Sequence, residues 1–334
     1  SENTTQKMQF VKVVFSIVAA LAVVASARQS VGTVDLVRTV NQKTKLWTAS
    51  LSSPVSRLTR EEVRALLGAG PEGFEHPGKY LLRRTYGAAA HAAAPESYDP
   101  REAYPNCTSM RMVRDQSACG SCWAVGAVAA MSDRSCIKEG QDAILSAEDM
   151  LACSGGGGCD GGQPVDAYLY WRDDGLVTEA CRPYPFPSCD HHVPSSTNPC
   201  PEDDYPTPLC TRQCKNGKAW KGDKHFAASV YYVQGVDDIM AELSSGGPCE
   251  ASFAVYEDFM VYTGGIYHYV SGRMCGYHAV KLMGYGVENG TKYWLLANSW
   301  NEHWGEKGFF RILRGSNECH IESEVVCGVA ANRK

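Results

Sequence analysis

The chain has 334 residues and a formal net charge of −5, with 44% hydrophobic and 21% charged residues. This length suffices for one large domain or for two moderate lobes around a sizeable core. The slightly acidic balance and the lack of any lysine- or arginine-rich block argue against a nucleic-acid-binding protein.

Cysteine is the most informative residue type. The chain has 15 cysteines, and most of them lie between Cys107 and Cys214. This density is typical of a disulfide framework in an oxidising compartment, and the odd number leaves at least one thiol free. The alternative is zinc, which favours paired C-x2-C ligands. Only Cys119 and Cys122 have that spacing, with no second pair, so we expect disulfides and neither a metal nor a cofactor.

Residues 1–27 have the pattern of a signal peptide. Met8 and Lys12 precede an apolar run, 13–24, and small residues that end at Ala27 follow it. The run is too short to span a bilayer. We therefore expect cleavage after Ala27, entry into the secretory pathway and no membrane anchor. The residues before Met8 are an upstream extension or a scar of cloning.

Residues 28–93 are expected to form a separate region. They contain no cysteine and carry one amphipathic helical pattern, 59–68, which Thr59 can cap together with Glu62. A stretch rich in glycine, alanine and histidine, 87–94, predicts an exposed, cleavable linker. A flexible leader and an inhibitory propeptide both fit this pattern, and the cysteine chemistry further along the chain favours the propeptide.

The remainder of the chain, 94–334, begins with a helical half. A segment that is apolar nearly all round predicts a buried helix over 123–137. Ser146 is placed to cap a second helix. A third helix is predicted over 164–171, with Gly175 just beyond its end.

The later part of the chain changes to strand patterns. A cysteine- and proline-rich stretch without periodicity, 181–214, separates the two halves, and Asn289-Gly290 predicts a tight hairpin turn. The expected strands are 250–256, 279–287, 292–297 and 309–313. A helical half followed by a β-rich half predicts an α+β fold with two lobes and a cleft between them.

Cys122 is the strongest candidate for a catalytic residue. It stands at the expected start of the buried helix, where unpaired backbone N–H groups and the positive dipole end favour an anion. A thiolate is stabilised at such a position and becomes nucleophilic. The side-chain amide of Gln116, together with the backbone N–H of Cys122, can form an oxyanion hole. A buried half-cystine is the alternative, although Cys119 is available for that role.

Three motifs together resemble the papain family of cysteine proteases. Cys122-Trp123 matches the nucleophile and the aromatic residue after it, with the preceding Cys-Gly-Ser also present. His278-Ala-Val matches the family's histidine segment, and Asn298-Ser-Trp300 matches its asparagine segment. The resemblance covers nearly all of the chain that follows the leader region.

The resemblance implies a papain-like two-lobe fold, with a helical left lobe, a β-barrel-like right lobe and the active site in the cleft. It implies that Cys122 is the nucleophile and that His278 takes its proton, which forms a thiolate–imidazolium pair. Asn298 would orient the imidazole, Trp300 would shield that contact, and Gln116 would complete the oxyanion hole.

Within that family, Cys189-Asp-His191-His192 resembles the occluding loop of the cathepsin B-like subfamily, which here would span about 181–214. The resemblance implies that this loop fills the primed end of the cleft. His191 and His192 would then bind the C-terminal carboxylate of the substrate. Peptidyl-dipeptidase activity is therefore expected beside endopeptidase activity.

The resemblance also implies further contacts and partners. Gly161 and Gly162 match glycines that pair with the substrate backbone, and Glu324 matches the acidic residue at the base of the S2 pocket. The expected partners are peptide and protein substrates, the chain's own propeptide as inhibitor, and cystatin-like inhibitors. A monomer is expected, located in the lysosome or outside the cell.

The same resemblance implies a disulfide pattern. The implied pairs are Cys107–Cys136, Cys119–Cys159, Cys153–Cys210, Cys181–Cys214 and Cys189–Cys200. The cysteines left over, apart from the nucleophile, are Cys249, Cys275, Cys319 and Cys327. A sixth bridge among these four has no assigned partners. Sequons at Asn106 and Asn289 predict glycosylation, although the second competes with the hairpin.

Several positions depart from the subfamily. Ser154 stands where the subfamily has a half-cystine, and His320 replaces a glycine. Tyr277 precedes His278 where the subfamily has a glycine, so its ring could narrow the cleft or shift the imidazole.

Two further departures concern the occluding loop. Thr197 and His303 replace an arginine and an aspartate that latch the loop in the subfamily, whereas Asp115, the expected partner of His191, is present. We therefore expect a more weakly held loop and relatively enhanced endopeptidase activity.

Two other functional classes compete with an active hydrolase. A pseudo-protease that binds peptides without cutting them is prompted by Tyr277. A structural secreted protein stapled by disulfides would need no site at all. It is disfavoured by the joint presence of Gln116, Cys122, His278 and Asn298, which packing alone does not require.

Overall fold

The computed structural model of the chain describes residues 29–70, 77–140, 142–189, 200–201 and 203–332. The predicted signal peptide, 1–27, lies outside these residues. Among the residues described, no helix is long and apolar enough to cross a membrane.

Helices dominate the first half of the described chain and strands dominate the second. The helices are α2 (Val34–Lys43), α3 (Arg60–Leu66), α4 (Ala88–Ala93), α5 (Pro100–Ala103), α6 (Cys122–Glu139), α7 (Ala147–Cys153), α8 (Pro164–Asp173) and α9 (Val236–Gly246). The strands are β1 (Trp47–Ala49), β2 (Ala227–Val233), β3 (Cys249–Tyr256), β4 (Tyr262–Tyr267), β5 (Met274–Glu288), β6 (Thr291–Ala297), β7 (Phe309–Leu313) and β8 (Val325–Ala330).

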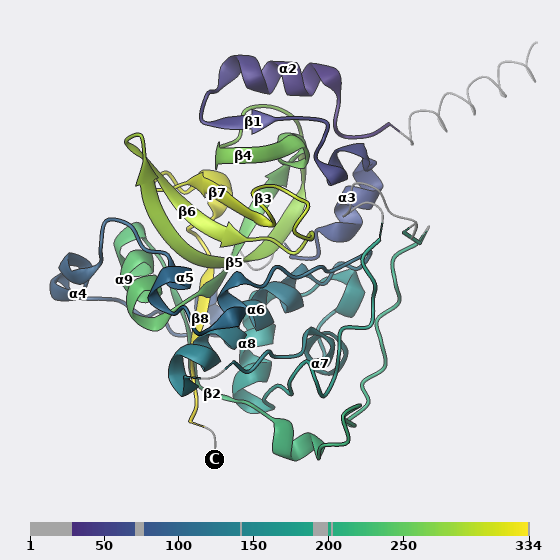
Figure 1. Cartoon of the computed structure of the whole chain (residues 1–334), viewed down its shortest axis with the longest axis vertical. Coiled ribbons are helices and arrows are strands. Elements are labelled where there is room, and N and C mark those ends of the chain that lie inside the picture. Colours follow the sequence, from purple (N-terminus) through teal and green to yellow (C-terminus); the bar gives the residue numbers. More distant parts are fainter. Residues whose placement is uncertain (1–28, 71–76, 141, 190–199, 202, 333–334) are drawn as a thin grey trace, which may run out of the picture.

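The strands form one eight-stranded sheet in the order β1-β4-β7-β6-β5-β3-β8-β2. Neighbouring strands are antiparallel except β4 and β7, which are parallel. Figure 1 shows β3 to β7 gathered in one lobe and α6, α7 and α8 in the other. The predicted two-lobe fold is confirmed, but the sheet does not close into a barrel, because β1 and β2 remain its edges.

Each lobe has its own apolar core. Phe253 and Trp294 belong to the core of the β-rich lobe, whereas Trp123 and Trp171 belong to that of the helical lobe. Burying such large rings removes much apolar surface from water, which stabilises each lobe separately.

Helix α6 is buried between the two lobes and packs against β5 and α8. The helix predicted over 123–137 is therefore confirmed and is slightly longer at both ends. Gly126 permits a close approach, because a Cβ there would lie 3.0 Å from a carboxylate oxygen of Glu250 and 3.3 Å from the Ala279 carbonyl oxygen. Gly140 ends the helix with a left-handed φ of 71°.

The other two helices predicted for this half also form. Ser146 caps α7, since its hydroxyl oxygen accepts a hydrogen bond from the Asp149 N–H at 2.9 Å. Helix α8 begins at Pro164, and Gly175 beyond its end has a left-handed φ of 71°.

The predicted hairpin joins β5 and β6. Asn289 and Gly290 have φ values of 49° and 78°, as a type I′ turn requires, and Glu288 pairs with Thr291 across it. The four expected strands correspond to β3, β5, β6 and β7. Strands β1, β2, β4 and β8 were not predicted, since their patterns do not stand out from the surrounding chain.

The expectation of a single helical pattern in 28–93 was incomplete. Helix α3 forms where predicted, and its capping box is present, with the Thr59 N–H donating to Glu62 Oε2 at 2.6 Å. Helix α2 forms as well, capped by Thr33, and so does the short helix α4. Only Val40 of α2 is fully buried, but Leu36 and Val37 also pack against the core of the β-rich lobe, so the helix was overlooked although its sequence is amphipathic.

The described part of the chain contains six disulfides. Five are the pairs implied by the resemblance: Cys107–Cys136, Cys119–Cys159, Cys153–Cys210, Cys181–Cys214 and Cys189–Cys200. The sixth, Cys249–Cys327, was left without assigned partners, and it links β3 to β8. Cys122, Cys275 and Cys319 are not in disulfides.

Candidate active site

Cys122 is the first residue of α6 and is completely buried. Burial is the main reason why the pKa of its thiol is raised to about 12, and backbone groups of Ala279 and Gly68 partly offset that effect. Gly68 belongs to the segment that precedes residue 94. This segment therefore contacts the Cys122 thiol through its backbone at Gly68.

His278 lies on β5 and is buried. Its Nε2 is 2.8 Å from Asn298 Oδ1, and the same oxygen accepts the Ser299 N–H at 2.8 Å. Because the backbone N–H identifies that amide atom as the oxygen, His278 Nε2 carries the proton and donates. The ring also stacks on Trp300, with centroids 4.8 Å apart. A neutral imidazole in this tautomer has Nδ1 as its basic nitrogen.

Gln116 connects the two lobes at this point. Its Nε2 donates to the Cys119 carbonyl at 2.8 Å and to the Leu66 carbonyl at 2.9 Å, while its Oε1 accepts from Ser299 Oγ at 2.6 Å. The hydroxyl of Ser299 therefore fixes the orientation of the amide. Leu66 belongs to the segment before residue 94, so the predicted oxyanion-hole donor holds a carbonyl of the chain itself.

The residues that follow Leu66 run as a short extended strand, which pairs with Gly162 on one side and with Tyr277 on the other through isolated β-bridges. Gly68 accepts the Gly162 N–H at 2.8 Å, and the Ala69 N–H donates to the Tyr277 carbonyl at 3.3 Å. A Cβ on Gly68 would lie 1.7 Å from the Gly120 carbonyl oxygen, so only glycine fits there. The segment thus bridges Gly162 of the helical lobe and Tyr277 of β5.

The predicted substrate glycines lie beside this strand. Gly162 pairs with it directly, and Gly161 has a φ of 108°, a conformation that favours glycine. The half-buried ring of Tyr277 packs against the core of the helical lobe, while its carbonyl faces the strand. His278 keeps its contact with Asn298 despite this bulky neighbour.

Glu324 is 1% exposed, and burial raises the pKa of its carboxyl group to about 8. Neither of its carboxyl oxygens has a hydrogen-bond partner among the residues described. Glu250 lies nearby on β3, also buried, and its pKa is raised by burial and by the charge of Glu324. Sequence reasoning missed Glu250, since only the pairing of β3 with β8 brings the two carboxyl groups together.

Several predicted residues lie elsewhere or outside the described part. His191, His192 and Thr197 fall outside the residues described, although the Cys189–Cys200 disulfide is present. Asp115 accepts hydrogen bonds from the Ser117 N–H at 2.8 Å and from Asn301 Nδ2 at 3.0 Å. His303 is exposed, and so are Asn106 and Asn289 of the two sequons.

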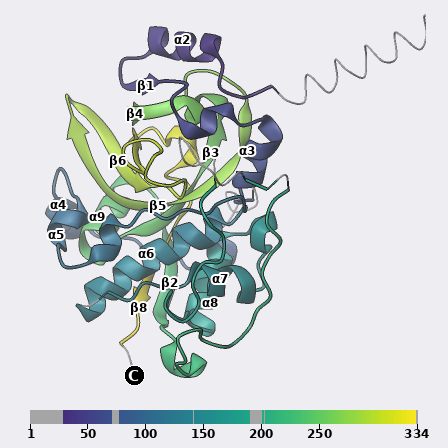
Figure 2. The same cartoon turned by 45° about the vertical axis from the view of Figure 1, so that its right-hand side comes forward.

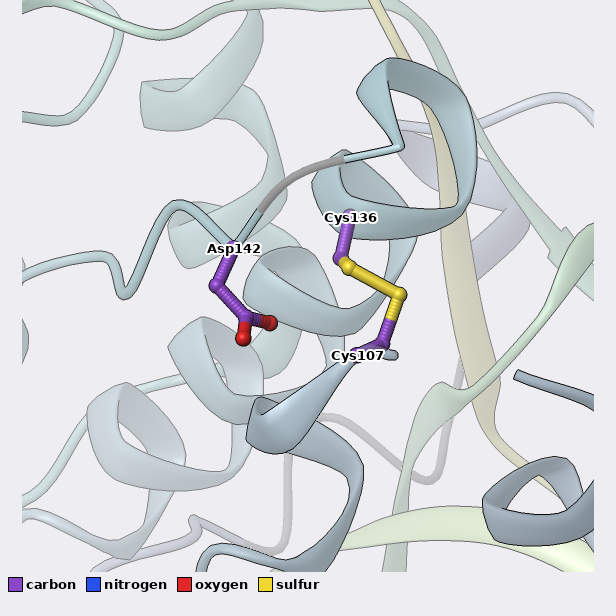
Figure 3. Close-up of side chains that lie close together, drawn as sticks. All are labelled: Cys107, Cys136 and Asp142. Atoms are coloured by element: carbon purple, nitrogen blue, oxygen red, sulfur yellow. A yellow bond between two sulfur atoms is a disulfide. The ribbon is translucent and has the colours of Figure 1, made fainter. Parts of the chain in front are cut away.

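Three clusters of cysteine and acidic side chains resemble metal-ligand sets in the part of the chain that the structure describes. In each of them the two sulfurs are bonded to each other, so neither is a thiolate ligand. Figure 3 shows one of them, with Asp142 beside the Cys107–Cys136 disulfide. The Asp142 carboxylate accepts from the Thr108 N–H at 2.9 Å and from the Thr108 hydroxyl at 2.6 Å.

Comparison with known proteins agrees with this geometry. Residues 94–329 match the family described as papain family cysteine protease. The chain is 46% identical over 314 residues to cathepsin B-like cysteine proteinase 6 of Caenorhabditis elegans, covering 88% of this chain and 82% of that protein. It is 43% identical over 301 residues to a cathepsin B-like cysteine proteinase of Schistosoma japonicum, covering 85% and 86%. The chain therefore belongs to the papain family of cysteine proteases.

Solved structures narrow the assignment within the papain family. The fold matches procathepsin B S9 from Trypanosoma congolense with a TM-score of 0.81 and 34% identity, covering 91% of this chain and 100% of that one. It matches a recombinant stem bromelain precursor with a TM-score of 0.68 at 23% identity, which concerns the fold alone. Within its family, the chain is a cathepsin B-like cysteine protease that is made as a proform.

Proposed function

We propose that the chain hydrolyses peptide bonds with Cys122 as nucleophile and His278 as general base and acid. The sulfur attacks the carbonyl carbon of the scissile bond while His278 takes the thiol proton, and the imidazolium then protonates the leaving amine. Water attacks the resulting thioester and releases the new carboxylic acid. Asn298 holds the imidazole in the required tautomer, which is supported by the 2.8 Å contact between Nε2 and Oδ1.

The observation that carries this proposal is the hydrogen bond from Gln116 Nε2 to the Leu66 carbonyl. A donor that already binds a peptide carbonyl beside the nucleophile can stabilise the oxyanion that forms there from a substrate. We propose that 28–93 is an inhibitory propeptide and that 94–334 is the peptidase domain. The strand around Gly68 would then exclude substrate and keep the Cys122 thiol neutral until it is removed.

The occluding loop, 181–214, is proposed to add peptidyl-dipeptidase activity. The assignment is supported by two disulfides between described residues of this stretch, Cys181–Cys214 and Cys189–Cys200. Carboxylate capture by His191 and His192 follows from the resemblance. We further propose that Glu324 admits arginine at the S2 pocket, and that the enzyme is a glycosylated monomer of the lysosome or the extracellular space, open to cystatin-like inhibitors.

The test is active-site labelling combined with turnover. After processing at acidic pH, the epoxide inhibitor E-64 should label Cys122 stoichiometrically, and the enzyme should cleave Phe-Arg and Arg-Arg amides. Release of C-terminal dipeptides should follow, and it should decrease when His191 is replaced by alanine. Labelling without turnover would instead identify a pseudo-protease that binds peptides.

A further inference from the structure

The last part of the segment before residue 94 is bound outside the cleft, along strand β2. The Tyr232 N–H donates to the Leu82 carbonyl at 3.1 Å, and the Arg84 N–H donates to the Tyr232 carbonyl at 2.8 Å. Arg83 thereby pairs in parallel with Tyr232. Because β2 is an edge of the sheet, the segment adds a single isolated β-bridge to that edge. Strand addition of this kind is a recurrent mode of peptide recognition.

A carboxylate in the first turn of α9 holds the same segment. Asp238 Oδ1 accepts the Tyr86 N–H at 3.0 Å and lies 2.8 Å from His91 Nε2, while Oδ2 lies 3.5 Å from Arg83 Nη2. Arg83 also donates to the Gln234 carbonyl at 3.0 Å. One carboxylate on the body of the protein thus contacts three polar groups of the bound segment.

Aromatic and apolar contacts fix the register of the segment. The Arg84 guanidinium lies 4.7 Å from the centre of the Tyr231 ring and 5.3 Å from that of Tyr86, so it sits between two aromatic faces. The Tyr86 hydroxyl donates to Glu242. Leu81 is buried in the core of the helical lobe. Helix α4, which follows, lies beside α9 in both views (Figure 1 and Figure 2).

We propose that the outer edge of β2 and the first turns of α9 form an exosite, a peptide-binding surface outside the catalytic cleft. Its occupant in the matured enzyme is an extended segment of a substrate or partner protein that carries an apolar residue, two adjacent arginines and a tyrosine. The chain's own Leu81-Leu-Arg83-Arg84-Thr-Tyr86 is the first example of this pattern. The proposal rests on the proposed function in one respect, since removal of the propeptide must uncover the surface.

Removal of the segment leaves this surface with unmet interactions. The backbone N–H and the carbonyl of Tyr232 both lose their hydrogen-bond partners, and Asp238 loses every contact described above. Peptide groups on an exposed strand edge are templates for pairing with another chain. The negative charge at α9 then selects a basic partner, and the Tyr231 ring selects a guanidinium over an ammonium group.

The experiment measures binding of a labelled peptide, residues 80–94, to the matured enzyme by fluorescence anisotropy at low salt. The full chain is first processed, its new N-terminus is determined by mass spectrometry, and Cys122 is then blocked with E-64. Because the blocked Cys122 cannot cleave the peptide, the signal reports binding of the intact peptide, and the variants below locate its site. Saturable binding that weakens with added salt is expected.

Two matched comparisons assign the surface. Asp238→Asn should weaken binding at least tenfold, whereas Asp237→Asn, an equal loss of charge at the exposed neighbouring position, should change it less than twofold. A peptide with Arg83→Ala and Arg84→Ala should also bind the wild-type enzyme at least tenfold more weakly. That peptide keeps the test decisive even if Asp238→Asn fails to fold.

Several results would overturn the exosite. One is that the Asp238→Asn variant binds the peptide as tightly as the wild-type enzyme does, or that the alanine peptide binds as tightly as the original peptide. The others are no binding of the peptide at all, and a mature N-terminus that retains residues 80–94. Dimerisation of the matured enzyme that Asp238→Asn abolishes would assign the surface to a second copy of the chain. Turnover of a dipeptidyl amide by the unblocked wild-type enzyme tests the proposed protease function separately.

Discussion

At the residue scale, the candidate site depends on a few side chains whose orientation is fixed by second partners. Ser299 holds the amide of Gln116 through its hydroxyl and the amide of Asn298 through its backbone N–H. One residue between the two lobes therefore orients both the proposed oxyanion donor and, through Asn298, the imidazole of His278. The serine of the Asn-Ser-Trp motif therefore contributes to the geometry of the candidate site as well as the asparagine.

Replacing Gln116 with alanine should lower kcat of the matured enzyme by roughly 10²–10³-fold, because one oxyanion donor is lost. Ser299→Ala removes only the hydroxyl that positions Gln116, so we expect a smaller loss. Steady-state kinetics on a Phe-Arg amide, corrected for active enzyme by titration with E-64, measures both. Unchanged kcat in Gln116→Ala would remove this residue from the catalytic machinery.

The Glu324 carboxyl group should make the proform less stable as the pH rises. Its pKa is raised from an ordinary value of 4.5 to about 8, so the folded chain binds more protons than the unfolded chain between these values. The contribution of this carboxyl group to stability is therefore fully present below pH 4.5 and is lost as the pH rises through about 8. Glu324→Gln should remove this loss, worth on the order of 2–4 kcal/mol, because a neutral amide replaces the buried charge.

Urea unfolding of the full chain at pH 5 and pH 8, in a Cys122→Ala background that prevents processing, measures this difference. Glu302→Gln, at an exposed position, serves as the control. Parallel pH dependence in the wild type and in Glu324→Gln would show that the carboxyl group is not buried as described.

At the element scale, the disulfides hold strands and loops that the sheet alone positions less firmly. Cys249–Cys327 joins β3 to β8 directly beside the pairing of Glu250 with Val326. It therefore secures the part of the sheet that carries Glu250 and Glu324. Both sulfurs are fully buried in the core of the β-rich lobe.

Removing this bridge should destabilise the chain strongly. The cross-link closes a loop with a sequence separation of 78, and loss of such a bridge costs roughly 2–5 kcal/mol of unfolding free energy. The double variant Cys249→Ala, Cys327→Ala measures the loss by urea unfolding under non-reducing conditions. Cys275→Ala, which removes a buried cysteine that is not in a disulfide, should have a clearly smaller effect. Equal losses would attribute the effect to packing and not to the cross-link.

At the scale of the whole molecule, a buried ion pair joins the two lobes. Lys281 Nζ on β5 lies 2.8 Å from Asp133 Oδ2 on α6, and both side chains are at most 1% exposed. These elements also carry His278 and Cys122. The pair therefore fixes the helix of the proposed nucleophile against the strand of its proposed base.

Lys281→Met should lower the unfolding free energy by roughly 3–5 kcal/mol, because it leaves the Asp133 charge buried without its cation. The double variant Lys281→Met, Asp133→Leu should recover most of that loss, since no buried charge remains. Urea unfolding of the full chain compares the two. A double variant that is as unstable as the single one would show that packing, and not the unpaired charge, dominates.

Much of the site was predictable because it is encoded locally. Cys122 and Gln116 lie in one short motif, and the start of α6 places the thiol at its N-terminus. The capping box at Thr59 and the hairpin at Asn289 likewise depend on neighbouring residues only. Helix α2 was overlooked although its sequence is amphipathic, with Leu36, Val37 and Val40 on one face that packs against the β-rich lobe.

By itself the sequence determined the local elements, the family resemblance and, through that resemblance, five disulfide pairs. The tertiary structure decided the contacts between distant segments: the Cys249–Cys327 bridge, the proximity of Glu250 and Glu324, and the docking of 81–91 on β2 and α9. The reason is physical. Helical and hairpin patterns depend on neighbours a few residues apart, whereas these contacts depend on strand order and register, which the whole chain sets together.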